Sequence, residues 1–281
     1  MISIEALSFS YSGHSREPLF RELSLDIAHG GIYGLLGRNG TGKTTLLRLM
    51  SGQLFPHGGR CTVLDRDPAD RAPELLRNMF FLPEEFRVPA ITGHAYVSLY
   101  APFYPGFDSS RFTTLALELE VNLDQRLSTL SFGQKKKFLL AFALATGCRM
   151  LFFDEPTNGL DIPSKRQFRR TVAASLAAGQ VILISTHQVR DMENLIDPII
   201  VLENGRIVFF HELDVVSRAL AMSHEPVPPA DDAVYAEQTM DGYTVLRRRR
   251  GDGTPVDLEL LFNAIIQAPE RVEQACVEGG R

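Results

Sequence analysis

The residues best suited to do chemistry lie in a glycine-rich segment at residues 37–44, GRNGTGKT, which fits the pattern GxxxxGK followed by Ser or Thr. Glycines in such a loop let backbone N–H groups turn toward phosphate oxygens, and the positive end of a following helix points at the same anions. Lys43 could then reach the β- and γ-phosphates of a nucleotide, and the Thr44 hydroxyl could ligate Mg²⁺. The segment follows an expected strand and precedes an expected helix, as this chemistry requires.

A second candidate is the pair of carboxylates, Asp154 and Glu155, that ends the apolar run at residues 150–153. A strand buried on both faces would place Asp154 at its carboxyl end, where α/β sheets bind ligands. Asp154 would hold Mg²⁺ directly or through water, and Glu155 would polarise an attacking water as a general base. Taken alone, the pair could also be two solvated acids at a strand end.

Further segments resemble the ATP-binding-cassette (ABC) family of nucleotide-binding domains. Residues 130–134, LSFGQ, look like the family's LSGGQ signature, about 20 residues before the acidic strand. Residues 154–161, DEPTNGLD, resemble its Walker B strand running into the D-loop, and His187 matches its switch histidine. These motifs and the phosphate loop occur in the family's order. The resemblance covers about residues 1–222.

The resemblance implies a way of using ATP and Mg²⁺. In the family, two domains pack head to tail, so that Ser131 and Gly133 of one would close over the γ-phosphate held by Lys43 of the other. Such a helix start is an anion site that faces outward. His187 would contact the γ-phosphate and keep the water in register with Glu155. Without the other motifs, residues 130–137 would read as a plain serine cap on a basic helix.

Tyr11 lies upstream of the loop, where the family has an aromatic residue that stacks on adenine; Phe9 is a competing candidate. The nucleotide-binding residues implied in this way are Tyr11, Gly37, Asn39, Gly40, Gly42, Lys43, Thr44, Thr45, Ser131, Gly133 and Gln134. The implied catalytic residues are Lys43, Glu155 and His187, and the implied Mg²⁺ ligands are Thr44, Asp154 and Glu84.

Two positions depart from the family's pattern. Glu84 stands where the Q-loop usually offers Gln; it can ligate Mg²⁺ or its water, but it adds negative charge near the phosphates. Phe132 replaces a signature glycine, which makes glycine-type backbone angles costly there. Both changes are compatible with ATP binding and with slower hydrolysis.

Two clusters leave alternatives open. Many aromatic residues follow Glu84, and they predict either the core of a helical subdomain or a groove for a coupling helix of a membrane partner: Phe86, Tyr96, Tyr100, Phe103, Tyr104 and Phe107. The run at residues 247–250, four arginines, predicts either a solvated strand end or a contact with anionic lipid headgroups or a partner.

The pattern of elements predicts an α/β fold of the P-loop NTPase type, with a mostly parallel sheet and an N-terminal antiparallel β subdomain. An α-helical signature subdomain is expected at residues 85–147, within an ATPase domain at residues 1–222. A Pro-rich linker at residues 223–232 would lead to a small C-terminal α+β appendage at residues 233–281. The appendage is expected to contain a hairpin around Asp241 and a helix that begins at Asp257.

Composition narrows the function. The chain has 281 residues and a net charge of −5, and the acidic balance argues against a general nucleic-acid binder. No apolar run approaches the roughly 18 to 20 residues that span a bilayer, and no signal peptide is evident. The three cysteines, Cys61, Cys148 and Cys276, have no metal-ligand spacing and suggest reduced thiols in the cytosol.

These observations favour an ATP-binding and ATP-hydrolysing subunit that energises a separate transmembrane permease. The stretch at residues 103–108, FYPGFD, looks like bacterial ABC-2-type exporter ATPases. The subunit would form a homodimer or heterodimer and lie in the cytoplasm on the inner face of the membrane. The first alternative is a soluble ABC ATPase acting on nucleic acid or the ribosome, although the 88 residues between Gly42 and Ser131 contain no sustained heptads. The second is a regulatory module without turnover, although Glu155 and His187 are both present.

Overall fold

A central six-stranded sheet organises the molecule. The computed structural model describes residues 1–11, 17–229, 232–249 and 254–279. The strand order is β5-β6-β7-β3-β8-β9; the first five strands are parallel, and β9 is antiparallel to β8. Their bounds are β5 Met79–Leu82, β6 Met150–Asp154, β7 Val181–Thr186, β3 Gly31–Leu36, β8 Ile199–Glu203 and β9 Arg206–His211. Because β6, β7 and β3 are parallel neighbours, their carboxyl ends lie at the same edge of the sheet, and the segments that follow them converge there.

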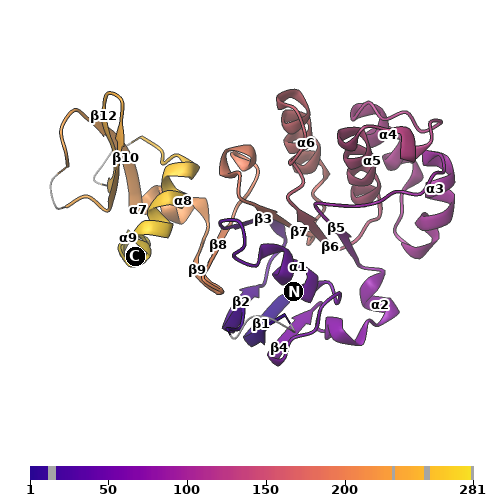
Figure 1. Ribbon diagram of the computed structural model, residues 1–281, viewed down its shortest axis with the longest axis horizontal. Helices are drawn as coiled ribbons and strands as arrows, with labels where there is room; N and C mark the ends of the chain where they lie inside the picture. The colour runs from indigo at the N-terminus through magenta and orange to yellow at the C-terminus, as the bar shows by residue number, and fades with distance from the viewer. Residues whose placement is uncertain (12–16, 230–231, 250–253, 280–281) are drawn as a thin grey trace.

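A second, antiparallel sheet is built from the N-terminal strands, as expected. Its order is β2-β1-β4, with β2 at Phe20–Ile27, β1 at Ile2–Phe9 and β4 at Gly58–Val63. The helix α1, Lys43–Met50, lies between this sheet and the central one (Figure 1). Leu46, Leu47 and Met50 of α1 are buried in a core shared by both sheets. The packed helix thereby fixes the loop that precedes it.

The helical subdomain also forms as expected, from α3 Gly93–Tyr100, α4 Ser109–Glu118 and α5 Phe132–Ala145. Side chains cap all three helices: Thr92, Asp108 and Ser131 each accept a hydrogen bond from a backbone N–H of the first turn. Four of its aromatic rings, Tyr96, Tyr104, Phe107 and Phe112, surround the buried Phe142 together with Phe80 of strand β5. Phe103, by contrast, is 64% exposed. The aromatic cluster is therefore mainly subdomain core, and Phe103 lies outside it.

The C-terminal unit differs from the expectation at its start. The expected linker at residues 223–232 begins inside a strand, β10 Leu220–Glu225, so the boundary expected at residue 222 falls within β10. This strand pairs with β12 Gly242–Arg248, which also pairs with β11 Tyr235–Thr239. The prolines that indicate a linker, Pro226, Pro228 and Pro229, come directly after the last residue of β10. The hairpin around Asp241 is confirmed, with Thr239 opposite Gly242.

Three helices complete the C-terminal unit: α7 Leu213–Ala219, α8 Leu258–Gln267 and α9 Pro269–Gly279. Asp257 caps α8, as expected, by accepting from the N–H groups of Glu259 and Leu260. Helix α9 was not expected, although its buried Val272, Ala275 and Cys276 show helical spacing. The unit lies at one end of the molecule and the helical subdomain at the other (Figure 1).

Within the four described ranges, no helix is long and apolar enough to cross a membrane. The remaining helical segments are α2 Pro73–Leu76, α6 Ile162–Ser175, and the 3₁₀ helices η1 Pro68–Asp70, η2 Ala101–Phe103, η3 Leu127–Thr129 and η4 Val189–Met192.

Candidate nucleotide-binding site

The loop between β3 and α1 has the conformation that its glycines were expected to permit. Gly40 and Gly42 adopt φ angles of 83° and 105°. A Cβ on Gly42 would lie 2.8 Å from the Phe20 ring, so a larger residue would clash there as well as strain the backbone. Gly42 is also the N-cap of α1, which has no side-chain cap. The first-turn N–H groups are therefore available to an anion.

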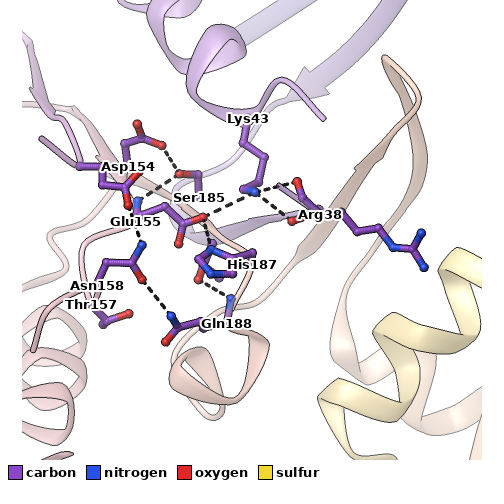
Figure 2. Close-up of polar contacts among 12 residues, drawn as sticks. Arg38, Lys43, Asp154, Glu155, Thr157, Asn158, Ser185, His187 and Gln188 are labelled. Carbon is purple, nitrogen blue, oxygen red and sulfur yellow. Dashed lines mark hydrogen bonds and ion pairs between the residues drawn. The ribbon is translucent and has the colours of Figure 1, made fainter. Parts of the chain in front are cut away.

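Lys43 lies across this loop (Figure 2). Its ammonium donates to the carbonyl oxygens of Gly37 at 2.8 Å and Arg38 at 3.1 Å. It also lies 3.5 Å from Oε1 of Glu155, and its side chain is only 6% exposed. Burial lowers the pKa of Lys43, and the nearby Glu155 carboxylate partly opposes that shift. The side chain is thus held where it can meet a phosphate.

Asp154, at the end of β6, is fixed by two hydroxyl groups. Thr44 Oγ1 donates to its Oδ1 and Oδ2 at 3.0 and 2.8 Å, and Ser185 Oγ donates to Oδ1 at 2.6 Å. The Thr44 hydroxyl and the Asp154 carboxylate are therefore adjacent, as two expected Mg²⁺ ligands should be. In the described part of the chain, no group of three or more His, Cys, Asp or Glu side chains could hold a metal alone. This donor set suits Mg²⁺, which commonly combines one or two carboxylates with substrate phosphates.

Glu155 has one oxygen engaged and one free. Its Oε1 lies 2.8 Å from Nδ1 of His187, whereas its Oε2 is buried and has no hydrogen-bond partner in the described structure. Its backbone has φ 44°, a left-handed conformation that is uncommon outside glycine. Its N–H donates to the carbonyl of Ser185 at 3.0 Å, which helps to hold that backbone. This carboxylate oxygen lies beside the phosphate loop and is available to accept a proton from a water molecule, as a general base does.

A cavity of about 590 Å³ is bordered by Lys43, Thr44, Glu155 and His187, whereas Asp154 lies behind Thr44 and does not line it. Most of the expected site residues line it: Tyr11, Asn39, Gly40, Gly42, Lys43, Thr44, Thr45, Glu84, Glu155 and His187. Tyr11 is 50% exposed, and its hydroxyl lies 2.9 Å from Oγ1 of Thr45. The competing Phe9 is buried in the N-terminal core. Of the two aromatics, Tyr11 alone lines the cavity.

Glu84 belongs to the same cavity but has a partner that the sequence did not suggest. Its Oε1 accepts from Nδ2 of Asn158 at 2.7 Å. Oδ1 of Asn158 accepts from Nε2 of Gln188 at 3.1 Å, the contact that Figure 2 shows beside His187. Asn158 thus joins the loops that follow β5, β6 and β7. Asn158, Gln188 and Ser185 were not predicted as site residues from the sequence, where their only signal is that they lie within or next to motifs.

The signature residues lie apart from this cavity, at the start of α5. Ser131 Oγ accepts from the N–H of Gln134, and Gln134 Oε1 accepts from the N–H of Ser131, which forms a capping box. Ser131 and Gln134 are exposed, and neither they nor Gly133 line the cavity around Lys43. Phe132 is the first helical residue and has no positive φ, so the backbone cost expected from replacing the signature glycine does not arise.

Known proteins share this fold and these motifs. Residues 20–158 match the family described as ABC transporter. The fluoroquinolones export ATP-binding protein of Mycobacterium tuberculosis is 31% identical over 212 residues, which are 74% of this chain and 69% of that protein. The Nod factor export ATP-binding protein I of a Bradyrhizobium species is 33% identical over 194 residues, 66% of this chain and 63% of that protein.

Among solved structures, a dimeric ATP-binding cassette in a post-hydrolysis state with ADP and phosphate has a TM-score of 0.66 and 21% identity. The match covers 75% of this chain and 98% of that one, and at this identity it shows the fold. A phosphate loop, an acidic strand end and an inserted helical subdomain on this fold define a P-loop ATPase. The chain belongs to the ABC transporter family. It is an ABC ATPase and binds ATP, like the ATP-binding proteins of this family.

Proposed function

We propose that this chain is the ATP-hydrolysing subunit of an ABC exporter. It drives a separate transmembrane permease through ATP-dependent closure of a pair of ATPase subunits. The observation that carries the proposal is the division of the site: the hydrolytic groups line one cavity, whereas the signature lies outside it. A site divided in this way is complete only when a second subunit supplies the missing part.

The hydrolytic groups have distinct roles in this proposal. Glu155 accepts the proton of the attacking water on Oε2, while His187 keeps its Oε1 in place. The Lys43 ammonium and the N–H groups of the loop stabilise the charge of the phosphates. Thr44 and Asp154, with Glu84 at the cavity wall, would hold Mg²⁺, which would neutralise further phosphate charge.

The second subunit supplies its signature. We infer that Ser131 and Gly133 of that subunit approach the γ-phosphate held by Lys43, because the cap at Ser131 engages the N–H of Gln134 and leaves the N–H groups before it at the helix start for an anion. The solved cassette dimer with ADP and phosphate supports such pairing. Hydrolysis would then separate the two ATPase subunits, and this conformational change would be transmitted to the permease.

Export and a membrane partner are proposed from the relatives, two of which are named as export ATP-binding proteins. We expect the subunit on the cytoplasmic face of the membrane, bound to the permease through its helical subdomain, where Leu99 and Phe103 are exposed. No feature of the described helical subdomain favours the alternative, an ATPase that acts on nucleic acid or the ribosome. The longest helix of the subdomain, α5, has 14 residues and forms no long coiled coil.

The test is affinity purification of the Glu155→Gln chain from detergent-solubilised membranes of its host in MgATP. This variant should bind ATP without cleaving it and therefore stay paired. We expect two ATPase subunits together with a multi-span membrane protein, measured by size exclusion with light scattering and by mass spectrometry. Lys43→Ala is the control and should not pair. Recovery with ribosomes or nucleic acid, or a monomer that still hydrolyses ATP at the wild-type rate, would contradict the proposal.

A further inference from the structure

A buried lysine on the signature helix has no role in the reaction as proposed so far. Lys136 lies five residues after Ser131, and its side chain is only 2% exposed. Its ammonium donates to the backbone carbonyl of Glu155 at 3.0 Å and to that of Asn158 at 2.9 Å. The lysine therefore reaches from α5 to the turn that carries the base.

The surroundings of this ammonium keep it in one place. Its nitrogen lies 5.0 Å from the centroid of the Phe132 ring, which itself stacks on Phe86 at 5.2 Å and 18°. Burial lowers the pKa of Lys136 to about 8, and the carboxylates of Glu84, Glu155 and Asp154 oppose that shift. Within the described residues, its direct partners are thus two carbonyl groups and one ring.

The turn that Lys136 contacts begins with a residue of unusual backbone geometry. Glu155 has φ 44°, and its carbonyl oxygen also accepts from the N–H of Asn158 at 3.2 Å. A left-handed conformation in a residue other than glycine persists when the surrounding structure holds it. Lys136 bonds both ends of this turn, so it fixes the direction in which the Glu155 side chain leaves the backbone.

We propose that Lys136 is a positioning residue for Glu155: it clamps the turn at residues 155–158 and thereby aims the free Oε2 at the attacking water. This inference rests on the proposed role of Glu155 as the general base. Lys136 does not itself line the cavity, and its contact with a lining residue is made through the backbone carbonyl of Glu155. It acts through the backbone, and it belongs to the helix whose first turn carries the signature.

The experiment compares Lys136→Met with the wild-type chain. Methionine has a similar length and no charge, so it suits the buried position but removes the ammonium donor from both carbonyls, and the Glu155 carbonyl keeps only the N–H of Asn158. We expect kcat to fall about 10- to 100-fold, as a small misplacement of a reacting group can cause. KM and the Kd for a fluorescent ATP analogue should change less than about twofold, since the loop around Lys43 is untouched. Lys137→Met, on the same helix, is the matched control and should hydrolyse ATP normally.

A second measurement separates positioning from general damage. In the Glu155→Gln background, Lys136→Met should not lower the residual turnover further, because the group that it positions is already disabled. A further fall would overturn the inference, and so would a kcat of Lys136→Met within about twofold of wild type. Lys136→Gln, which keeps an N–H donor, replaces the Met variant if thermal unfolding shows that the latter is not folded; it should show a smaller fall in kcat.

The outcomes also separate this inference from the proposed function. If Glu155→Gln hydrolyses ATP at the wild-type rate, the assignment of Glu155 as the base fails. If Glu155→Gln is inactive and Lys136→Met is normal, only the role of Lys136 fails.

Discussion

At the residue scale, each carboxylate of the site is oriented by a different kind of partner. Hydroxyl groups of Thr44 and Ser185 hold Asp154, the His187 imidazole holds Glu155, and the Asn158 amide holds Glu84. Three acidic groups can therefore lie near one phosphate loop without sharing a partner. Because the partners differ, single substitutions can separate what each carboxylate does.

Glu84→Gln is the substitution that tests the departure in the Q-loop. The amide keeps an oxygen that can accept from Asn158 but removes a negative charge from the cavity. We expect ATP without metal to bind several-fold more tightly, since repulsion of the phosphates is weaker. We also expect half-maximal hydrolysis to need several-fold more Mg²⁺, because a carboxylate ligand is lost.

The measurements are the Kd for ATP in EDTA and a Mg²⁺ titration of ATPase activity. Glu85→Gln is the control and should change neither. An unchanged Mg²⁺ requirement in Glu84→Gln would remove Glu84 from the expected ligands and leave it as a partner of Asn158.

The sequence predicted the residues of the site better than the contacts between them. The phosphate loop and the acidic pair could be recognised because each motif is contiguous and follows an apolar strand. The bonds of Asn158 to Glu84 and Gln188 join residues 74 and 30 positions apart, so only the folded sheet brings them together. Lys136 was part of a run of three lysines, and nothing in that run marks the middle one as buried.

At the element scale, the parallel strands and the three helices of the signature subdomain follow from local patterns. Their apolar runs are bounded by turn residues, and Thr92, Asp108 and Ser131 cap the helices. Strand β10 was missed because its partner, β12, comes after the prolines in the chain. A strand whose only partner is distant in sequence carries a weak local signal.

The signature helix offers a prediction at this scale. Phe132→Gly restores the family's residue but removes the ring that stacks on Phe86 and covers Lys136. We expect the free energy of unfolding to fall by about 1 to 2 kcal/mol, from the lost stacking and the poorer helix former. Urea unfolding measures this change. Phe132→Leu, which keeps the helix propensity, isolates the contribution of the ring; a Gly variant as stable as wild type would show that the ring contributes nothing.

At the scale of the whole molecule, the central sheet lies between the helical subdomain on one side and the C-terminal unit on the other (Figure 1). The C-terminal unit reaches the site's border, since Glu259 of α8 pairs with Arg190 of η4, three residues after His187. Of the arginine run, Arg247 pairs with Glu225 and Asp232, and Arg248 pairs with Glu278. These two arginines are thus engaged within the unit, while Arg250 lies outside the described residues.

The position of Ser131, outside its own chain's cavity, has a genetic consequence. A Glu155→Gln chain keeps Lys43 and Ser131, so it should still form an ATP-bound dimer with a wild-type chain. Because it cannot hydrolyse its ATP, this dimer should dissociate slowly. Added in excess to the wild-type chain, it should lower total ATPase activity more than the same excess of Lys43→Ala, which cannot hold the nucleotide. Equal effects of the two additions would argue against a shared site. In a cell that carries one wild-type and one Glu155→Gln gene copy, the defect would be dominant, because each variant chain inactivates the wild-type chain with which it dimerises.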